Sequence, residues 1–122
     1  MILVIEELHH IALHVKDVAE STNFYQTVLG LVPLERPDFA FPGAWFRLGS
    51  QQELHLIGGR EQQVLSSNHS NHFALRVLDI KSTAQFLTDR SMELLGPKRR
   101  TDGAWQIFIK DPDGHTIEFC QL

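Results

Sequence analysis

The stretch "HIALHVKD" at residues 10–17 decides the fold, because its pattern returns as "HFALRVLD" at residues 72–79. Each copy opens on a histidine, continues with alternating residues and closes on an aspartate. Alternation with a period of two predicts a β-strand. Phe24 and Phe86 then follow the two aspartates at the same distance. Two copies are too few for a solenoid, so the repeat predicts a pseudo-symmetric domain made of two similar modules.

Both modules have the same predicted order of elements. Asp17 and Asp79 suit helix N-termini, since a carboxylate accepts hydrogen bonds from unpaired backbone N–H groups. Apolar residues at helical spacing follow each aspartate, and Gly30 ends the first helix. Three short strands are expected after each helix, near 31–35, 44–48 and 53–57, and near 93–97, 104–110 and 115–121. The predicted fold is therefore α+β, a single domain over 1–122 with βαβββ modules at about 5–60 and 68–122.

Composition excludes several classes of protein. The 122 residues carry a net charge of −4, and the longest basic run is "KRR" at 98–100, which argues against nucleic acid binding. The single cysteine, Cys120, excludes an intrachain disulfide and predicts a reduced, cytoplasmic protein. The apolar "MILVI" at 1–5 is too short for a membrane span or signal peptide, so no membrane association is expected.

Strand parity gathers a candidate metal site. Successive side chains of a strand point to opposite faces of the sheet. Four polar residues therefore lie on the face that the apolar residues of their strands do not occupy: His10, His55, His72 and Glu118. A single strand histidine is more often hydrogen-bonded or partly exposed, and only the joint placement favours a ligand role. Imidazoles and a carboxylate suit one divalent metal ion per site, and these ligands accept Ni, Zn, Co, Mn or Fe.

Three segments together resemble the vicinal oxygen chelate superfamily. They are "HIALHVKDVAESTNFYQTVLGL" at 10–31, "HFALRVLD" at 72–79 and "DPDGHTIEF" at 111–119. This superfamily includes glyoxalase I, methylmalonyl-CoA epimerase, fosfomycin-resistance enzymes, extradiol dioxygenases and bleomycin-binding proteins. The resemblance covers essentially the whole chain. It implies that the modules form a curved, half-open mixed β-barrel around a metal, with the helices outside, commonly as a homodimer.

The resemblance also assigns roles to the four polar residues. His10, His72 and Glu118 fall on the ligand positions most widely shared in the superfamily, and His55 falls on the variable fourth position. A coordinating His55 favours the isomerase and epimerase branch, because the fosfomycin-resistance and dioxygenase branches usually lack that ligand. The implied activity is that of a metal-dependent, glyoxalase I-like lyase or isomerase, with Glu118 as ligand and general base. A transferase or dioxygenase of the same superfamily, or a metal-free binding module, is the alternative.

Four more side chains are candidate contacts of a small-molecule substrate. His14 stands where glyoxalase I has an arginine that helps to hold glutathione, so glutathione is not implied. Arg76, its counterpart in the second module, suits an anionic substrate group, and equally suits a surface cation. Trp45 and Phe108 are aromatic candidates. Packing in the core or at a dimer interface explains both of them as well.

Overall fold

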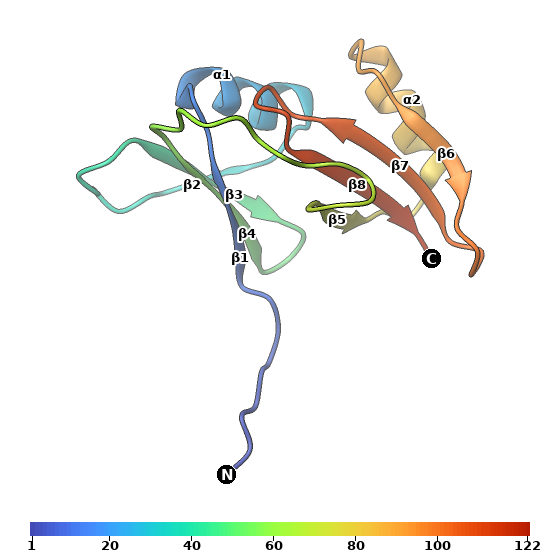
Figure 1. The fold of residues 1–122 in the computed structure, drawn as a ribbon, viewed down its shortest axis with the longest axis horizontal. Helices are drawn as coiled ribbons and strands as arrows, with labels where there is room; N and C mark the ends of the chain where they lie inside the picture. The colour runs from blue at the N-terminus through green and yellow to red at the C-terminus, as the bar shows by residue number, and fades with distance from the viewer. The chain divides into compact units, whose positions relative to one another are not determined.

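The chain forms two compact units, Met1–Glu61 and Gln62–Leu122, in a computed structural model that describes all 122 residues. Figure 1 colours the first unit blue to green and the second yellow to red. Each unit contains one four-stranded mixed sheet and its own helical segment, and neither sheet closes on itself. The predicted α+β class with two βαβββ units is confirmed. No helix has the length and apolar character needed to cross a membrane.

The first unit has its sheet in the order β1-β4-β3-β2. Strand β1 runs parallel to β4, and the other neighbouring pairs are antiparallel. The elements are β1 (His10–His14), α1 (Val18–Asn23), the π-helix η1 (Phe24–Val28), β2 (Pro33–Leu34), β3 (Gly43–Leu48) and β4 (Gln52–Ile57). Strand β1 is the first strand of the unit and β4 is the last, so their pairing brings the beginning and the end of the unit side by side.

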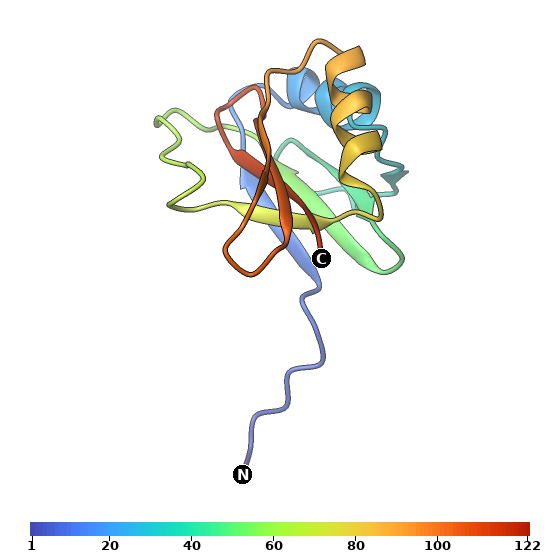
Figure 2. The ribbon, with the colours of Figure 1, turned by 90° about the vertical axis from the view of Figure 1, so that its right-hand side faces the viewer.

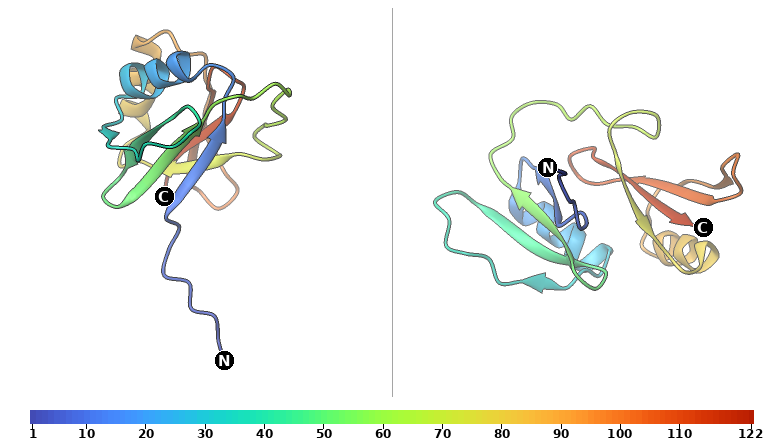
Figure 3. Two further views of the ribbon diagram at one scale, coloured as in Figure 1. Left: turned by 90° about the vertical axis from the view of Figure 1, so that its left-hand side faces the viewer. Right: turned by 90° about the horizontal axis from the view of Figure 1, so that it is seen from below.

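The second unit repeats this topology in the order β5-β8-β7-β6, with β5 parallel to β8. Helix α2 packs against its own sheet (Figure 2), and Figure 3 gives two further views of both units. The pairing of β6 with β7 is irregular between Leu95 and Lys98. The elements are β5 (Phe73–Arg76), α2 (Ile80–Asp89), β6 (Leu95–Arg99), β7 (Trp105–Lys110) and β8 (Thr116–Gln121).

Both predicted helix caps are confirmed. The Asp17 carboxylate accepts a hydrogen bond from the Glu20 amide at 3.2 Å, and Asp79 accepts one from the Lys81 amide at 3.0 Å. The first helix ends before Gly30 as predicted, and Gly30 has a positive φ of 73°, but the last turn from Phe24 to Val28 is a π-helix. Two consecutive aromatic residues of this turn, Phe24 and Tyr25, are buried.

The apolar parity of the strands is also confirmed. Leu54 and Leu56 of β4 are completely buried, and Ile117 and Phe119 of β8 are buried in the second unit. These side chains take one face of each sheet, so the alternate residues lie on the other face. The polar residues singled out by the sequence belong to that second face.

Candidate functional site

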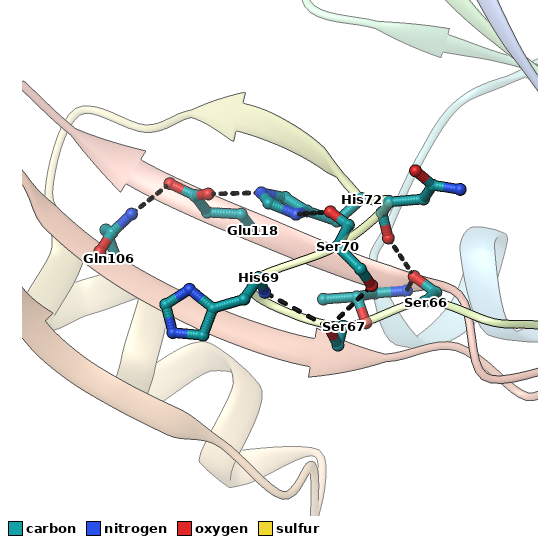
Figure 4. Close-up of polar contacts among 9 residues, drawn as sticks. Ser66, Ser67, His69, Ser70, His72, Gln106 and Glu118 are labelled. Carbon is teal, nitrogen blue, oxygen red and sulfur yellow. Dashed lines mark hydrogen bonds and ion pairs between the residues drawn. The ribbon is translucent and has the colours of Figure 1, made fainter.

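His72 and Glu118 form a direct contact in the second unit, although they lie far apart in the sequence. His72 precedes β5, and β5 is paired with β8 so that Ala74 lies opposite Glu118. The His72 Nε2 atom lies 3.0 Å from Glu118 Oε1. Figure 4 marks this contact with a dashed line. The Glu118 side chain is only 6% exposed and that of His72 is 23% exposed. Two of the four predicted ligands are therefore brought together.

Two further contacts hold this pair in place (Figure 4). The His72 Nδ1–H donates to the Ser70 carbonyl oxygen at 3.0 Å, and the Gln106 amide donates to Glu118 Oε2 at 3.1 Å. Since a carbonyl oxygen can only accept, the proton of a neutral His72 ring resides on Nδ1. Its Nε2 lone pair then faces a carboxylate oxygen. A metal cation placed beside these two acceptor atoms would be attracted by both of them.

The donor set of the pair fits a divalent metal ion. Imidazole nitrogen and carboxylate oxygen are both common ligands of divalent metal ions. The His72 Nε2 and Glu118 Oε1 atoms lie close enough for both to contact one ion. A histidine ligand also typically donates its other ring N–H to a carbonyl or carboxylate, as His72 does. Neither unit gathers a group of three or more His, Cys, Asp or Glu side chains that could hold a metal.

His10 and His55 are neighbours in the first unit, but their rings stack instead of converging. The two ring centroids are 4.2 Å apart with planes at 17°. The Trp45 ring stacks on the His55 ring at 4.1 Å and 5°. Desolvation, followed by the nearby imidazoles of His55 and His9, lowers the pKa of His10 and favours its neutral form. The lone pair of a ring nitrogen lies in the plane of its ring, and the His10 and His55 ring planes are nearly parallel. The two lone pairs therefore do not point toward a common atom. At least one of the rings must rotate before both histidines can bind the same ion.

Glu53 is a contact that the sequence interpretation missed. Its Oε1 atom lies 2.9 Å from His55 Nε2, and Arg47 lies 3.8 Å from its Oε2. The hydrogen bond from His55 is the main cause that lowers the pKa of Glu53. The available signal was its position two residues before His55, on the same strand face. Gln106 carried no comparable signal, because its role depends on the pairing of β7 with β8.

The four candidate substrate contacts have different surroundings. Phe108 lies opposite Glu118 in the sheet, and its ring meets the His72 ring edge to face at 5.7 Å. Arg76 is exposed and lies opposite Cys120, on the strand face that carries Glu118. His14 contacts the Gly58 carbonyl oxygen through Nε2 at 3.1 Å. Trp45 packs on His55, so both aromatic candidates touch a predicted ligand.

A cavity of about 470 Å³ lies in the second unit. This volume is within the usual range of small-molecule sites. Phe108 lines the cavity and also contacts His72, whereas neither His72 nor Glu118 lines it. Its wall is mainly apolar and includes polar groups at Ser67, Lys110 and Thr116.

Comparisons with known proteins agree on one family. Residues 7–119 match the model of the Glyoxalase/Bleomycin resistance protein/Dioxygenase superfamily. The chain is 31% identical over 121 residues to Glyoxylase I 4 of Arabidopsis thaliana, covering 93% of this chain and 69% of that protein. It is 27% identical over 119 residues to Metallothiol transferase FosB of Staphylococcus saprophyticus, covering 93% and 76%. A solved structure named as a glyoxalase family protein from Bacillus anthracis has a TM-score of 0.83 at 26% identity, covering 99% and 98%.

Proposed function

We propose, since the chain belongs to the Glyoxalase/Bleomycin resistance protein/Dioxygenase superfamily, that it is a metal-dependent lyase or isomerase of the glyoxalase I type. Its reaction would move a proton at a carbon next to a carbonyl group of a small oxygenated substrate. The observation that carries the proposal is the His72–Glu118 pair, in which an imidazole nitrogen and a buried carboxylate oxygen lie 3.0 Å apart. The similarity to Glyoxylase I 4 supports the same reaction class.

The proposed ligands are His72 and Glu118, to which the sequence pattern adds His10 and His55. When bound, one divalent ion (Ni, Zn, Co, Mn or Fe) supplies Lewis acidity toward neighbouring substrate oxygens. The Ser70 carbonyl orients His72 for this role by holding its Nδ1 proton. The pair keeps its orientation because both partners have a second contact.

Glu118 is the proposed general base. Its Oε2 atom accepts a hydrogen bond from the Gln106 side-chain amide, and its Oε1 atom faces His72. These two contacts fix the orientation of the carboxylate plane. The carboxylate takes the proton from the substrate carbon, holds it on an oxygen atom, and returns it to the neighbouring carbon. Phe108 covers the His72 ring and helps to exclude water from the proton while it is held.

Substrate recognition is proposed for Arg76, His14, Trp45 and Phe108. Arg76 supplies a positive charge that would attract an anionic substrate. Arg76 also lies on the same face of the sheet as Glu118. The protein is further proposed to work in the cytoplasm as a homodimer. Light scattering on the purified protein measures its mass in solution, and a monomer at assay concentrations would refute the dimer.

A second candidate function depends on whether His55 binds the metal. Its Nε2 atom is bound to Glu53, and its ring packs on Trp45. If His55 is not a ligand, an open metal position favours oxygen-dependent ring cleavage or thiol transfer to an epoxide. In thiol transfer a thiolate sulfur bonds to an epoxide carbon, the carbon–oxygen bond breaks, and the oxygen takes a proton. The similarity to Metallothiol transferase FosB supports this alternative. A metal-free binding module comes last, because the whole predicted ligand set is present in the sequence.

Metal content tests the proposal. The protein is purified without an affinity tag or added metal, and bound metal is counted by mass spectrometry. We expect about one ion per chain in the wild type, strong loss in His72→Ala, and no loss in His69→Ala, the matched control from the adjoining loop. Retention in His55→Ala would move the transferase and dioxygenase candidates ahead. Absence of metal from the wild type, even after reconstitution, would refute the metal-dependent function.

A further inference from the structure

His55 is held on two sides within the first unit. Strand pairing places Trp45 directly opposite His55, and the two rings are nearly parallel at 4.1 Å. Glu53 precedes His55 by two residues on β4 and therefore points to the same face, where its Oε1 atom lies 2.9 Å from Nε2. His55 is only 9% exposed. Turning the imidazole over would move a carbon atom into the position of Nε2 and lose the contact with Glu53.

The contact with Glu53 also determines which nitrogen of His55 carries the proton. An ionised carboxylate can only accept hydrogen bonds, so His55 Nε2 must donate. A neutral imidazole has one protonated nitrogen, which leaves the lone pair of His55 on Nδ1. His72 is held in the opposite way, because its Nδ1–H donates to the Ser70 carbonyl and its lone pair is on Nε2.

We propose that Glu53 is a positioning residue that fixes His55 in the Nε2–H tautomer, so that His55 presents Nδ1 while His72 presents Nε2. The purpose of this arrangement rests on the proposed function, since a metal ligand needs a lone pair of defined direction. A carboxylate bound to the far nitrogen of a histidine ligand is the arrangement that fixes such a direction. The second unit has no such carboxylate, because β8 carries Thr116 two residues before Glu118.

Nitrogen-15 NMR tests the tautomer directly in the metal-free protein. Multiple-bond ¹H–¹⁵N correlation spectra at about pH 8, above the usual imidazole pKa of about 6.5, distinguish protonated from unprotonated ring nitrogens. We expect the His55 proton on Nε2 in the wild type and in Glu53→Gln, whose amide oxygen also accepts. Glu53→Leu should give a mixture of tautomers, and Glu20→Leu on the exposed face of α1 should match the wild type. A proton on Nδ1 in the wild type, or an unchanged tautomer in Glu53→Leu, would overturn the proposal.

Metal affinity provides the second readout, measured by competition for Zn²⁺ with a chromophoric chelator. Loss of a partner of this kind typically weakens metal binding by roughly 10- to 100-fold, which we expect for Glu53→Leu, with recovery in Glu53→Gln. The two proposals fail separately. A wild type that binds no Zn²⁺ overturns the metal-dependent function, and the tautomer alone then decides the role of Glu53. A wild type that binds Zn²⁺ while Glu53→Leu keeps both tautomer and affinity overturns only the positioning role.

Discussion

Replacing Gln106 by leucine should destabilise the protein through Glu118. The Gln106 amide donates to Glu118 Oε2 at 3.1 Å, and the Glu118 side chain is 6% exposed, so water has little access to replace the lost donor. A hydrogen bond to a charged group contributes about 1.5–3 kcal/mol, and its removal leaves a buried acceptor without a partner. Leucine is close to glutamine in size, so little of the effect should come from a cavity. We therefore expect the free energy of unfolding at neutral pH to fall by about 1.5–3 kcal/mol.

Urea denaturation of the metal-free protein measures this loss. Gln85→Leu is the matched control, because Gln85 also donates to a carboxylate, Asp89, but on the exposed surface of α2. Such exposed pairs on a helix contribute about 0.2–0.5 kcal/mol. If Gln106→Leu and Gln85→Leu lose the same stability, the argument that Gln106 supports a buried carboxylate is wrong.

The remaining predictions concern stability and titration elsewhere in the chain. Ser66→Ala removes the hydroxyl that accepts from the buried Thr116 amide at 2.8 Å, and we expect a loss of about 1–3 kcal/mol in urea denaturation; an unchanged midpoint would contradict it. Leu56→Ala empties a completely buried position of β4, and calorimetry should show a loss of about 2–5 kcal/mol, whereas less than about 1 kcal/mol would contradict the close packing of this face. The Arg100 side chain, followed by the Ala104 amide, lowers the pKa of Asp102 from 3.8 to about 2, so the stabilising contribution is complete above pH 3.8 and is lost as the pH falls through about 2. NMR titration of Arg100→Gln should return the Asp102 midpoint toward 3.8, and a midpoint that stays near 2 would show that Arg100 is not the cause.

Local patterns predicted the frame of this protein well. Helix caps and strand alternation depend on a few neighbouring residues, which is why Asp17 and Asp79 cap their helices as expected. Parity also placed His72 and Glu118 on one face, since strand geometry fixes the direction of each side chain. The π-helix at the end of α1 was not predicted, because helical spacing of apolar residues does not distinguish a π-helical turn from an α-helical one.

The contacts around the proposed ligands could not be derived from the sequence. Parity says that His10 and His55 share a face, but it does not say whether the rings converge or stack, which depends on side-chain rotamers. Likewise, the donor to Glu118 is Gln106 because β7 and β8 pair in one particular register. Register and rotamers are settled by tertiary packing, so strand parity predicted which residues share a face but not which atoms they contact.

The matching register of the two units has a consequence for how such a protein can change by mutation. Ala12 lies opposite His55 in the first sheet, and Ala74 lies opposite Glu118 in the second. Strands are joined through backbone hydrogen bonds, which do not distinguish an imidazole from a carboxylate. His55 and Glu118 therefore occupy equivalent positions of the two units. A mutation can change the side chain at one of these positions while the other position keeps its residue. The neighbouring residue on the adjoining strand is a small alanine in both cases, so the pairing itself does not require one particular side chain at either position.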